Sequence, residues 1–264
     1  MGGLEAIDPR YAALWARAQE VLGADERVRA VELAGSVASG TADRWSDLDL
    51  AVVTHDEGHD VLLADWPRWL AEITPTVFAR TPIAPMIVNA VTADGLTLDL
   101  VIHRGEVFTF PPATEYVVGA LSGTRFADVD AALEYAVAEQ LRGLAGPFIS
   151  LIARDEHVKH LAGVPHVLGL LTTVFLAERN APPPGKLWNA TYTEEQRAAV
   201  AALPPVRATR ADLIAFGLGV AELLLGRARP LFAERGLAWP GDLAAVAAAR
   251  VGEQLGLGDL PWLH

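Results

Sequence analysis

The chain contains no cysteine, and this absence removes several kinds of chemistry. Disulfide bonds, thiolate nucleophiles and cysteine-ligated metal centres are all excluded. Basic residues are also scarce: 21 lysines and arginines stand against 33 aspartates and glutamates, for a formal net charge of −12. Solubility alone accounts for much of this charge, but such a field also repels polyanions and attracts cations. We therefore do not expect a nucleic-acid partner, and we expect a cationic small molecule in preference to a transfer RNA.

The sequence also lacks an uninterrupted apolar run of membrane-spanning length, although 52% of its residues are hydrophobic. Charged residues or prolines interrupt each long apolar run. The N-terminus has neither the basic segment nor the apolar core of a signal peptide. We therefore expect a soluble, cytoplasmic protein without a membrane partner.

The most informative stretch of the sequence lies between Leu33 and Val53. Residues 28–34 form a short run rich in branched side chains, which predicts a strand. Gly35 and Ser36 end this run, and a glycine there allows a tight turn and the close approach of a ligand. Backbone N–H groups at such a turn, together with the Ser36 hydroxyl, suit a phosphate.

Residues 48–53 form a second predicted strand, which carries carboxylates. Because side chains alternate along a strand, Asp47 and Asp49 share one face while Leu48 and Leu50 occupy the other. Two carboxylates on one face repel each other unless a cation lies between them. Mg²⁺, which also bridges to substrate phosphates, is the usual occupant of such an oxygen site.

A third carboxylate, Asp99, lies in the apolar strand predicted for residues 96–103. An aspartate inside an apolar strand is costly unless it is paired, hydrogen-bonded or bound to a metal. If this strand lies beside residues 48–53, Asp99 reaches the same metal site.

The motifs Gly35-Ser36 and Asp47-Leu48-Asp49, with ten residues between them, and the later strand residue Asp99 resemble the nucleotidyltransferase superfamily related to polymerase beta. Within this superfamily the chain is similar to antibiotic nucleotidyltransferases of the aminoglycoside adenylyltransferase kind. The motifs cover residues 33–53 and 97–102. The resemblance implies an α/β (α+β) fold, with an N-terminal mixed-sheet nucleotidyltransferase domain followed by a C-terminal helical bundle.

The resemblance also implies roles for individual residues. Asp47 and Asp49 would hold Mg²⁺, and Asp99 would either complete the metal site or accept a proton from the attacking hydroxyl as general base. We favour the base role for Asp99. The helical half offers alternative bases, each of which is more simply a solvated helix residue: Glu134, Glu139 and Glu156. The expected nucleotide-binding residues are Gly35, Ser36, Ser46 and Lys186, with a solvated loop residue as the equally weighted alternative for Lys186.

The pattern of apolar residues divides the chain into two domains, residues 1–110 and 111–264, with Phe110-Pro111-Pro112 as the boundary. The first domain combines helices over 8–23 and 58–73, the latter broken at Pro67, with strands over 28–34, 48–53, 77–79, 86–92 and 96–103. The second shows helical patterns alone, over 127–144, 148–159, 164–179, 209–235 and 241–255, with a further helix start at Thr193.

Two groups of side chains have a structural and a functional interpretation. We interpret Trp66 and Trp69 as core packing in preference to a stacking platform for a base. We interpret His157, His160 and His166 as helix-face or inter-domain polar residues, because a zinc site needs more ligands than two histidines three residues apart supply.

We therefore predict an Mg²⁺-dependent nucleotidyltransferase that transfers a nucleotide monophosphate, AMP from ATP, to a hydroxyl of a small cationic acceptor such as an aminoglycoside and releases pyrophosphate. Antibiotic resistance would be the corresponding biological role. One alternative is toxin-like nucleotidylation of transfer RNA or protein, and another is a non-catalytic nucleotide-sensing module on the same fold. The sequence leaves open the acceptor, the preferred base and the choice between monomer and homodimer.

Overall fold

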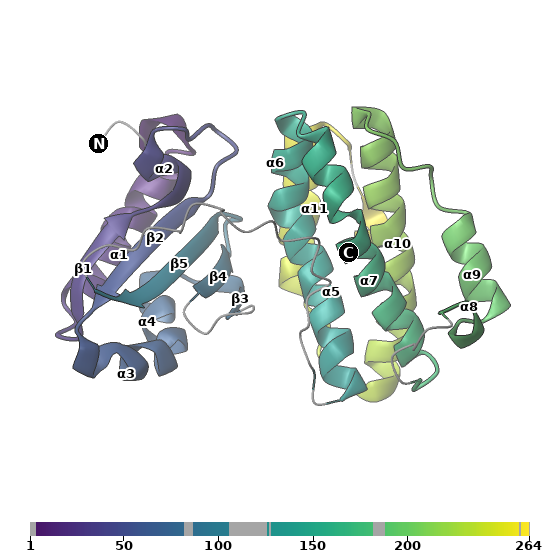
Figure 1. Cartoon of the computed structure of the whole chain (residues 1–264), viewed down its shortest axis with the longest axis horizontal. Coiled ribbons are helices and arrows are strands. Elements are labelled where there is room, and N and C mark those ends of the chain that lie inside the picture. Colours follow the sequence, from purple (N-terminus) through teal and green to yellow (C-terminus); the bar gives the residue numbers. More distant parts are fainter. Residues whose placement is uncertain are drawn as a thin grey trace. The chain divides into compact units, whose positions relative to one another are not determined.

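A computed structural model describes residues 4–81, 87–105, 126, 128–181, 188–258 and 260–263. The chain divides into two compact units, Met1–Tyr116 and Val117–His264, and we describe each by itself (Figure 1). The first contains the sheet and the second is helical, so the predicted fold class is confirmed. The predicted boundary at 110–112 lies outside the described residues.

The first unit is built on one mixed five-stranded sheet with the strand order β1-β2-β5-β4-β3. β2 and β5 run parallel at its centre, and the other neighbouring pairs are antiparallel. The strands are β1 (Val28–Leu33), β2 (Leu48–Thr54), β3 (Thr76–Arg80), β4 (Ile87–Thr92) and β5 (Thr97–Arg104). Each strand lies where its apolar pattern predicts one. The pairing that Asp99 requires, β5 beside β2, is therefore present.

Helices α1 and α4 of the first unit begin at sequence signals. Asp8 accepts a hydrogen bond from the Arg10 backbone N–H at 3.0 Å and so caps the start of α1. The helical pattern over 58–73 breaks just before Pro67, which lies in the first turn of α4. The helices are α1 (Arg10–Gly23), α2 (Gly35–Ser39), α3 (His59–Ala64) and α4 (Trp66–Ile73), with 3₁₀ turns η1 (Leu4–Ala6) and η2 (Asp56–Gly58).

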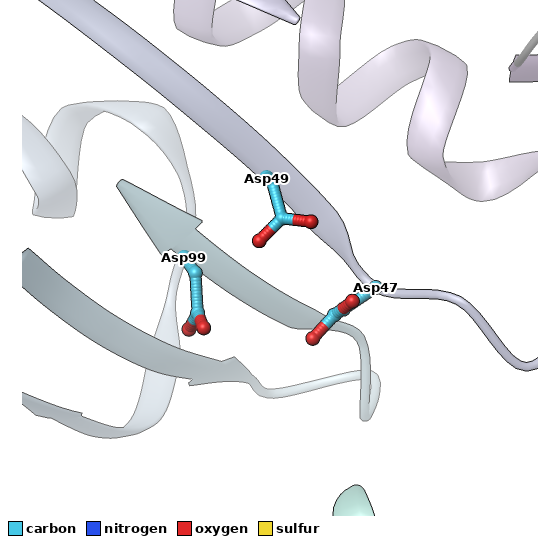
Figure 2. Close-up of side chains that lie close together, drawn as sticks. All are labelled: Asp47, Asp49 and Asp99. Atoms are coloured by element: carbon cyan, nitrogen blue, oxygen red, sulfur yellow. The ribbon is translucent and has the colours of Figure 1, made fainter. Parts of the chain in front are cut away.

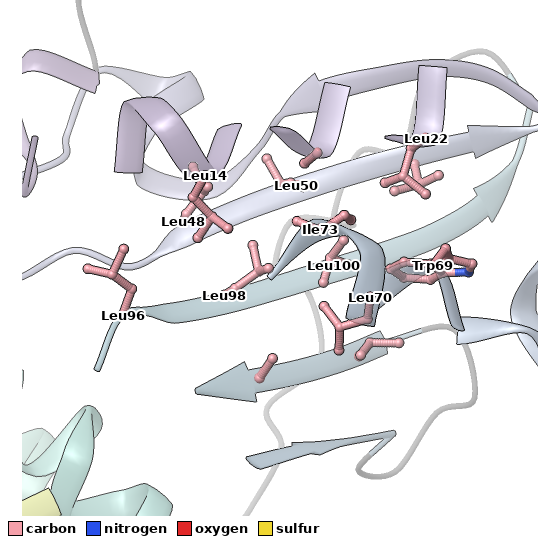
Figure 3. Packing of buried hydrophobic residues seen from close by; sticks show 14 of the residues in the cluster. Leu14, Leu22, Leu48, Leu50, Trp69, Leu70, Ile73, Leu96, Leu98 and Leu100 are labelled. Carbon is pink, nitrogen blue, oxygen red and sulfur yellow. The ribbon is translucent and has the colours of Figure 1, made fainter. Parts of the chain in front are cut away.

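One face of this sheet forms the hydrophobic core of the unit (Figure 3). The strands contribute alternate side chains, including Leu48, Leu50, Leu98 and Leu100, and helices α1 and α4 cover them. Trp69 is 1% exposed and its indole N–H donates to the backbone carbonyl of Leu62, so its interpretation as a core residue is confirmed. Because side chains alternate, burying the leucines on this face places Asp49 and Asp99 on the opposite face.

The second unit is a helical bundle in which α5 packs against α7 and α11, and α7 packs against α10. Thr193 and Gln196 form a reciprocal capping box at the start of α9, as predicted. The helices are α5 (Val129–Ala145), α6 (Pro147–Ala153), α7 (His157–Ala177), α8 (Trp188–Thr191), α9 (Glu194–Ala201), α10 (Arg210–Arg235) and α11 (Gly241–Leu255), followed by the 3₁₀ turn η3 (Pro261–Leu263).

One helix boundary in this unit differs from the prediction. The patterns over 148–159 and 164–179 predict a break between residues 159 and 164, but α7 continues through Pro165. The break lies earlier, between Ala153 and His157, where Asp155 adopts a left-handed backbone with φ of 54°. Aspartate is one of the few residues that reach this conformation readily.

The same helix α7 is long and apolar enough to cross a membrane by length and composition, with a mean hydropathy of 1.5 over its most apolar window. Of that window, 28% is buried within the described structure. The second half of α7 is buried in the bundle through Leu170, Leu171, Val174 and Phe175.

Candidate functional site

Asp49 owes its position to the alternation of side chains along β2. Leu48, Leu50 and Val52 point into the core and are fully buried. Asp49 therefore projects from the other face, and Asp47 precedes the first residue of the strand. Both aspartates are half-buried. The predicted pair of carboxylates thus stands at the start of a central strand.

Asp99 joins this pair because β5 runs parallel to β2. The strand register places Asp99 directly opposite Asp49. Figure 2 shows the carboxyl groups of Asp47, Asp49 and Asp99 pointing toward one another, and each offers a carboxylate oxygen within 4.8 Å of the others. Among the described residues, this is the only group of three or more aspartate, glutamate or histidine side chains with the spacing of metal ligands.

The turn at Gly35 closes directly onto Asp49. The Ala34 backbone N–H donates to the Asp49 backbone carbonyl at 2.8 Å, and the Ser36 backbone N–H donates to the Asp49 carboxylate. Gly35 has a φ of +55°, and a Cβ atom there would lie 1.9 Å from Oδ2 of Asp49. Only glycine therefore fits between the turn and this carboxylate.

The electrostatics of the cluster are concentrated on Asp49. Burial is the main cause that raises its pKa to about 7, and the charges of Asp47 and Asp99 raise it further. The hydrogen bond from the Ser36 N–H opposes this shift but is weaker. A divalent cation among the three carboxylates would remove the like-charge repulsion, so the donor set fits a hard metal ion that prefers oxygen ligands.

The predicted nucleotide-binding residues have different surroundings. The Oγ atom of Ser36 is buried and has no hydrogen-bond partner among the described residues. The Ser46 hydroxyl, by contrast, accepts from the Asp43 backbone N–H at 3.1 Å and donates to the Asp43 carboxylate at 3.2 Å. Ser46 thus holds the loop that leads into Asp47. Lys186 lies outside the described residues.

The acidic and histidine residues considered in the helical half differ in their surroundings. Glu134 and Glu156 are exposed, as expected of solvated helix residues. The expectation that Glu139 is a solvated residue was wrong, because its side chain is buried and forms a two-point ion pair with Arg142, with His166 at 3.6 Å. His160 packs edge-on against Phe148, and burial lowers its pKa. Each of these partners lies in the same helical unit, as expected of residues that stabilise a bundle.

Asn89 is a site residue that the sequence interpretation missed. It lies on β4 directly opposite Asp99, and its Nδ2 atom donates to Oδ1 of Asp99 at 2.6 Å. A signal for it exists in the sequence. The turn at 93–95 sets the register of the β4–β5 hairpin, and a hairpin centred on residue 94 pairs 89 with 99.

Residues 17–104 match the family model described as a nucleotidyltransferase domain. This segment contains the Gly35-Ser36 turn and all three clustered aspartates, so the predicted resemblance is confirmed and transferase activity is supported. Among solved structures, the chain is similar to an aminoglycoside 6-adenyltransferase from Bacillus subtilis, with 12% identity, coverage of 91% of this chain and 96% of that chain, and a TM-score of 0.36. No curated protein matches the chain.

Proposed function

We propose that this protein is an Mg²⁺-dependent nucleotidyltransferase that moves AMP from ATP to a hydroxyl group of a small cationic acceptor and releases pyrophosphate. The observation that carries this proposal is the convergence of Asp47, Asp49 and Asp99 beside the Gly35-Ser36 turn. All five residues lie inside the segment that matches the nucleotidyltransferase domain.

The carboxylates are the proposed metal ligands. Their oxygens lie within 4.8 Å of one another, and burial together with the charges of Asp47 and Asp99 raises the pKa of Asp49, so a bound cation would relieve the repulsion within the cluster. When bound, Mg²⁺ would neutralise charge on the triphosphate and on the leaving pyrophosphate. Asp47 and Asp49 hold it, and Asp99 lies close enough to contribute an oxygen as well.

The turn supplies the proposed triphosphate contacts. Gly35 allows the phosphates to approach the backbone, and the Ser36 hydroxyl, which has no hydrogen-bond partner within the described part of the chain, can donate to one of them. Ser46 contributes through the loop that it holds in place, and Lys186 provides a positive charge for the β- and γ-phosphates. Together these contacts would place the α-phosphate at the carboxylate cluster.

The proposed reaction is an in-line displacement at the α-phosphorus. The acceptor oxygen forms a bond to phosphorus while the bond from phosphorus to the α–β bridging oxygen breaks, and pyrophosphate leaves with that oxygen. Asp99 accepts the proton of the acceptor hydroxyl as general base. No further oxidant, reductant or cofactor is required for this balance.

The charge of the chain supports a cationic acceptor. A net charge of −12 attracts polycations and repels transfer RNA. An aminoglycoside has both the positive charge and the hydroxyl groups that the reaction needs, and its modification in the cytoplasm would confer antibiotic resistance. The acceptor class rests on charge and family resemblance, since a fold does not dictate a substrate.

The test is mass spectrometry of a reaction that contains the full chain, Mg²⁺, the four nucleoside triphosphates and a panel of aminoglycosides and lincosamides. We expect one antibiotic to gain the mass of AMP, and neither the Asp47→Ala/Asp49→Ala variant nor a reaction with chelator to give the product. A product of another mass would identify a different donor nucleotide.

The absence of any antibiotic adduct would overturn the proposed acceptor. Pyrophosphate release with transfer RNA or protein as acceptor would then favour the toxin-like reaction. Triphosphate binding without Mg²⁺-dependent pyrophosphate release from any acceptor would instead favour a nucleotide sensor.

A further inference from the structure

The sheet register places four polar residues in one row that leads into the proposed metal site, and the row begins with Arg80 on β3, which pairs directly with Asn89. Asn89 on β4 pairs directly with Asp99 on β5, and Asp99 pairs directly with Asp49 on β2. Directly paired residues project from the same face of a sheet. Asp99 therefore has a second carboxylate on one side and the amide of Asn89 on the other.

The contact between Asn89 and Asp99 has a defined direction. An ionised carboxylate accepts hydrogen bonds and donates none, so the amide must turn its NH₂ group toward Asp99. The distance from Nδ2 to Oδ1 is 2.6 Å, which is short, as expected when the acceptor carries a charge. Both residues are half-buried, so this bond is sheltered from competition by solvent.

We propose that Asn89 is a positioning residue that holds the Asp99 carboxylate in the orientation required for cation binding. Repulsion from Asp49 favours rotation of Asp99 away from the cluster when no cation is present. The Asn89 hydrogen bond holds Oδ1 of Asp99 in the conformer in which the three carboxylates converge, so leaving this conformer breaks the bond and less reorganisation accompanies cation binding. The inference rests on the proposed function in that it takes this cluster as the metal site, and Asn89 itself touches neither metal nor substrate.

The experiment measures Mn²⁺ binding to the full chain by electron paramagnetic resonance, with the metal alone as probe. Loss of a partner that orients a metal ligand typically weakens binding about 10- to 100-fold. We expect Asn89→Ala to weaken Mn²⁺ binding about tenfold, at the lower end of that range. Ile87→Val is the matched control, because Ile87 lies two residues earlier on β4 and pairs with Val101. This control should bind Mn²⁺ as the parent does.

A double-mutant cycle separates positioning from general packing. If Asn89 acts through Asp99, Asn89→Ala should cause no further loss of Mn²⁺ affinity in an Asp99→Ala background. An equal loss in both backgrounds would show that Asn89 acts through packing and would overturn the inference. Should Asn89→Ala fail to fold, Asn89→Val keeps a strand-favouring side chain without the donor and takes its place.

Equal Mn²⁺ affinity in the parent and Asn89→Ala would overturn the inference and leave the proposed function intact. A parent chain that binds no Mn²⁺ would overturn it together with the metal dependence of the proposed reaction. Because the readout is metal affinity, the result does not depend on knowing the acceptor.

Discussion

Burial and the like charges of its neighbours shift the pKa of Asp49 far from its ordinary value. Because its pKa is raised to about 7 in the folded protein and lies near 3.8 ordinarily, the folded state binds the proton more tightly than the unfolded state. Folding stability is therefore unaffected by Asp49 below about pH 4, falls as the pH rises from about 4 to 7, and stays reduced above that range.

Replacement of Asp49 by asparagine should remove this pH-dependent penalty. With a chelator present at pH 8, we expect Asp49→Asn to unfold at a higher temperature than the parent. The expected gain in free energy of unfolding is about 1–3 kcal/mol at pH 8 and smaller at pH 5. Thermal unfolding at the two pH values is the measurement. The exposed carboxylate Glu57 provides the control, since Glu57→Gln should show no such difference. The prediction would be contradicted if the difference in stability between Asp49→Asn and the parent were the same at pH 5 and at pH 8.

The fit of Gly35 against Asp49 leads to a second prediction. Gly35→Ala places a methyl group on the Asp49 carboxylate and strains the backbone, so we expect loss of about 2–4 kcal/mol of stability and loss of Mg²⁺-dependent thermal stabilisation. Gly40 also has a positive φ, of +71°, but a Cβ there meets nothing within 4 Å. Gly40→Ala should therefore cost only the backbone strain, about 1–2 kcal/mol, and keep the Mg²⁺ response. Equal behaviour of the two variants would refute the role of the Asp49 contact.

Replacement of Asp99 should reduce catalysis much more than nucleotide binding. We expect Asp99→Asn to reduce kcat for nucleotidyl transfer by about 10²-fold or more, because the general base is lost, while triphosphate binding is partly retained. Steady-state kinetics and equilibrium binding of ATP measure the two effects. The exposed Asp56 in turn η2 serves as control, and Asp56→Asn should be indistinguishable from the parent. Near-normal turnover by Asp99→Asn would exclude the base role.

At the scale of elements, the β4–β5 hairpin shows how far the sequence predicts the site. Alternation and an apolar setting singled out Asp47, Asp49 and Asp99 as carboxylates that need a partner, and the family resemblance supplied their expected roles. The contribution of Asn89 follows from hairpin register, which requires the turn centre as well as the strands. The raised pKa of Asp49 could not be predicted in this way, because it depends mainly on burial by the rest of the unit, which a local sequence pattern does not show.

Helix α7 shows why the remaining boundary was predicted wrongly. Pro165 removes one backbone hydrogen bond and usually ends or kinks a helix. Here Pro165 is exposed, so water can satisfy the carbonyl that it leaves free. The break occurs instead at Asp155, whose left-handed conformation has no strong signal in a segment without glycine. Tertiary packing of the second half of α7 then maintains one continuous helix.

Two glycines of α10 should respond in opposite ways to replacement by alanine, because only one of them packs against α6. A Cβ at Gly217 would lie 2.4 Å from the Phe148 ring, so Gly217→Ala should destabilise the helical unit by about 1–3 kcal/mol. Gly226, on the same helix, is exposed and has nothing within 4 Å of a Cβ position. Gly226→Ala should therefore stabilise the protein by about 0.5–1 kcal/mol through helix propensity. Denaturant unfolding of both variants checks the signs, and destabilisation by both would contradict this account.

At the scale of the whole molecule, local pattern predicted the fold, whereas the cationic partner expected from the net charge and the family resemblance stays a prediction. The mixed sheet and the helical second unit follow from the spacing of apolar residues, which has the period of strands in the first half of the chain and of helices in the second. The net charge of −12 is a property of the entire chain, and its effect reaches beyond any single contact. It therefore bears on how charged substrates arrive.

If the proposed reaction is correct, salt should raise the KM for the cationic acceptor but not the KM for the triphosphate. Raising the ionic strength from about 0.01 M to about 0.1 M shortens the Debye length from about 30 Å to about 10 Å. Screening weakens the attraction of the acidic chain for a polycationic acceptor, so the KM for that acceptor should rise severalfold. The KM for the anionic triphosphate should stay constant or fall, because screening relieves repulsion. Steady-state kinetics at both ionic strengths measure the two constants, and an acceptor KM that does not rise would show that attraction by the overall charge is not what brings the acceptor to this enzyme.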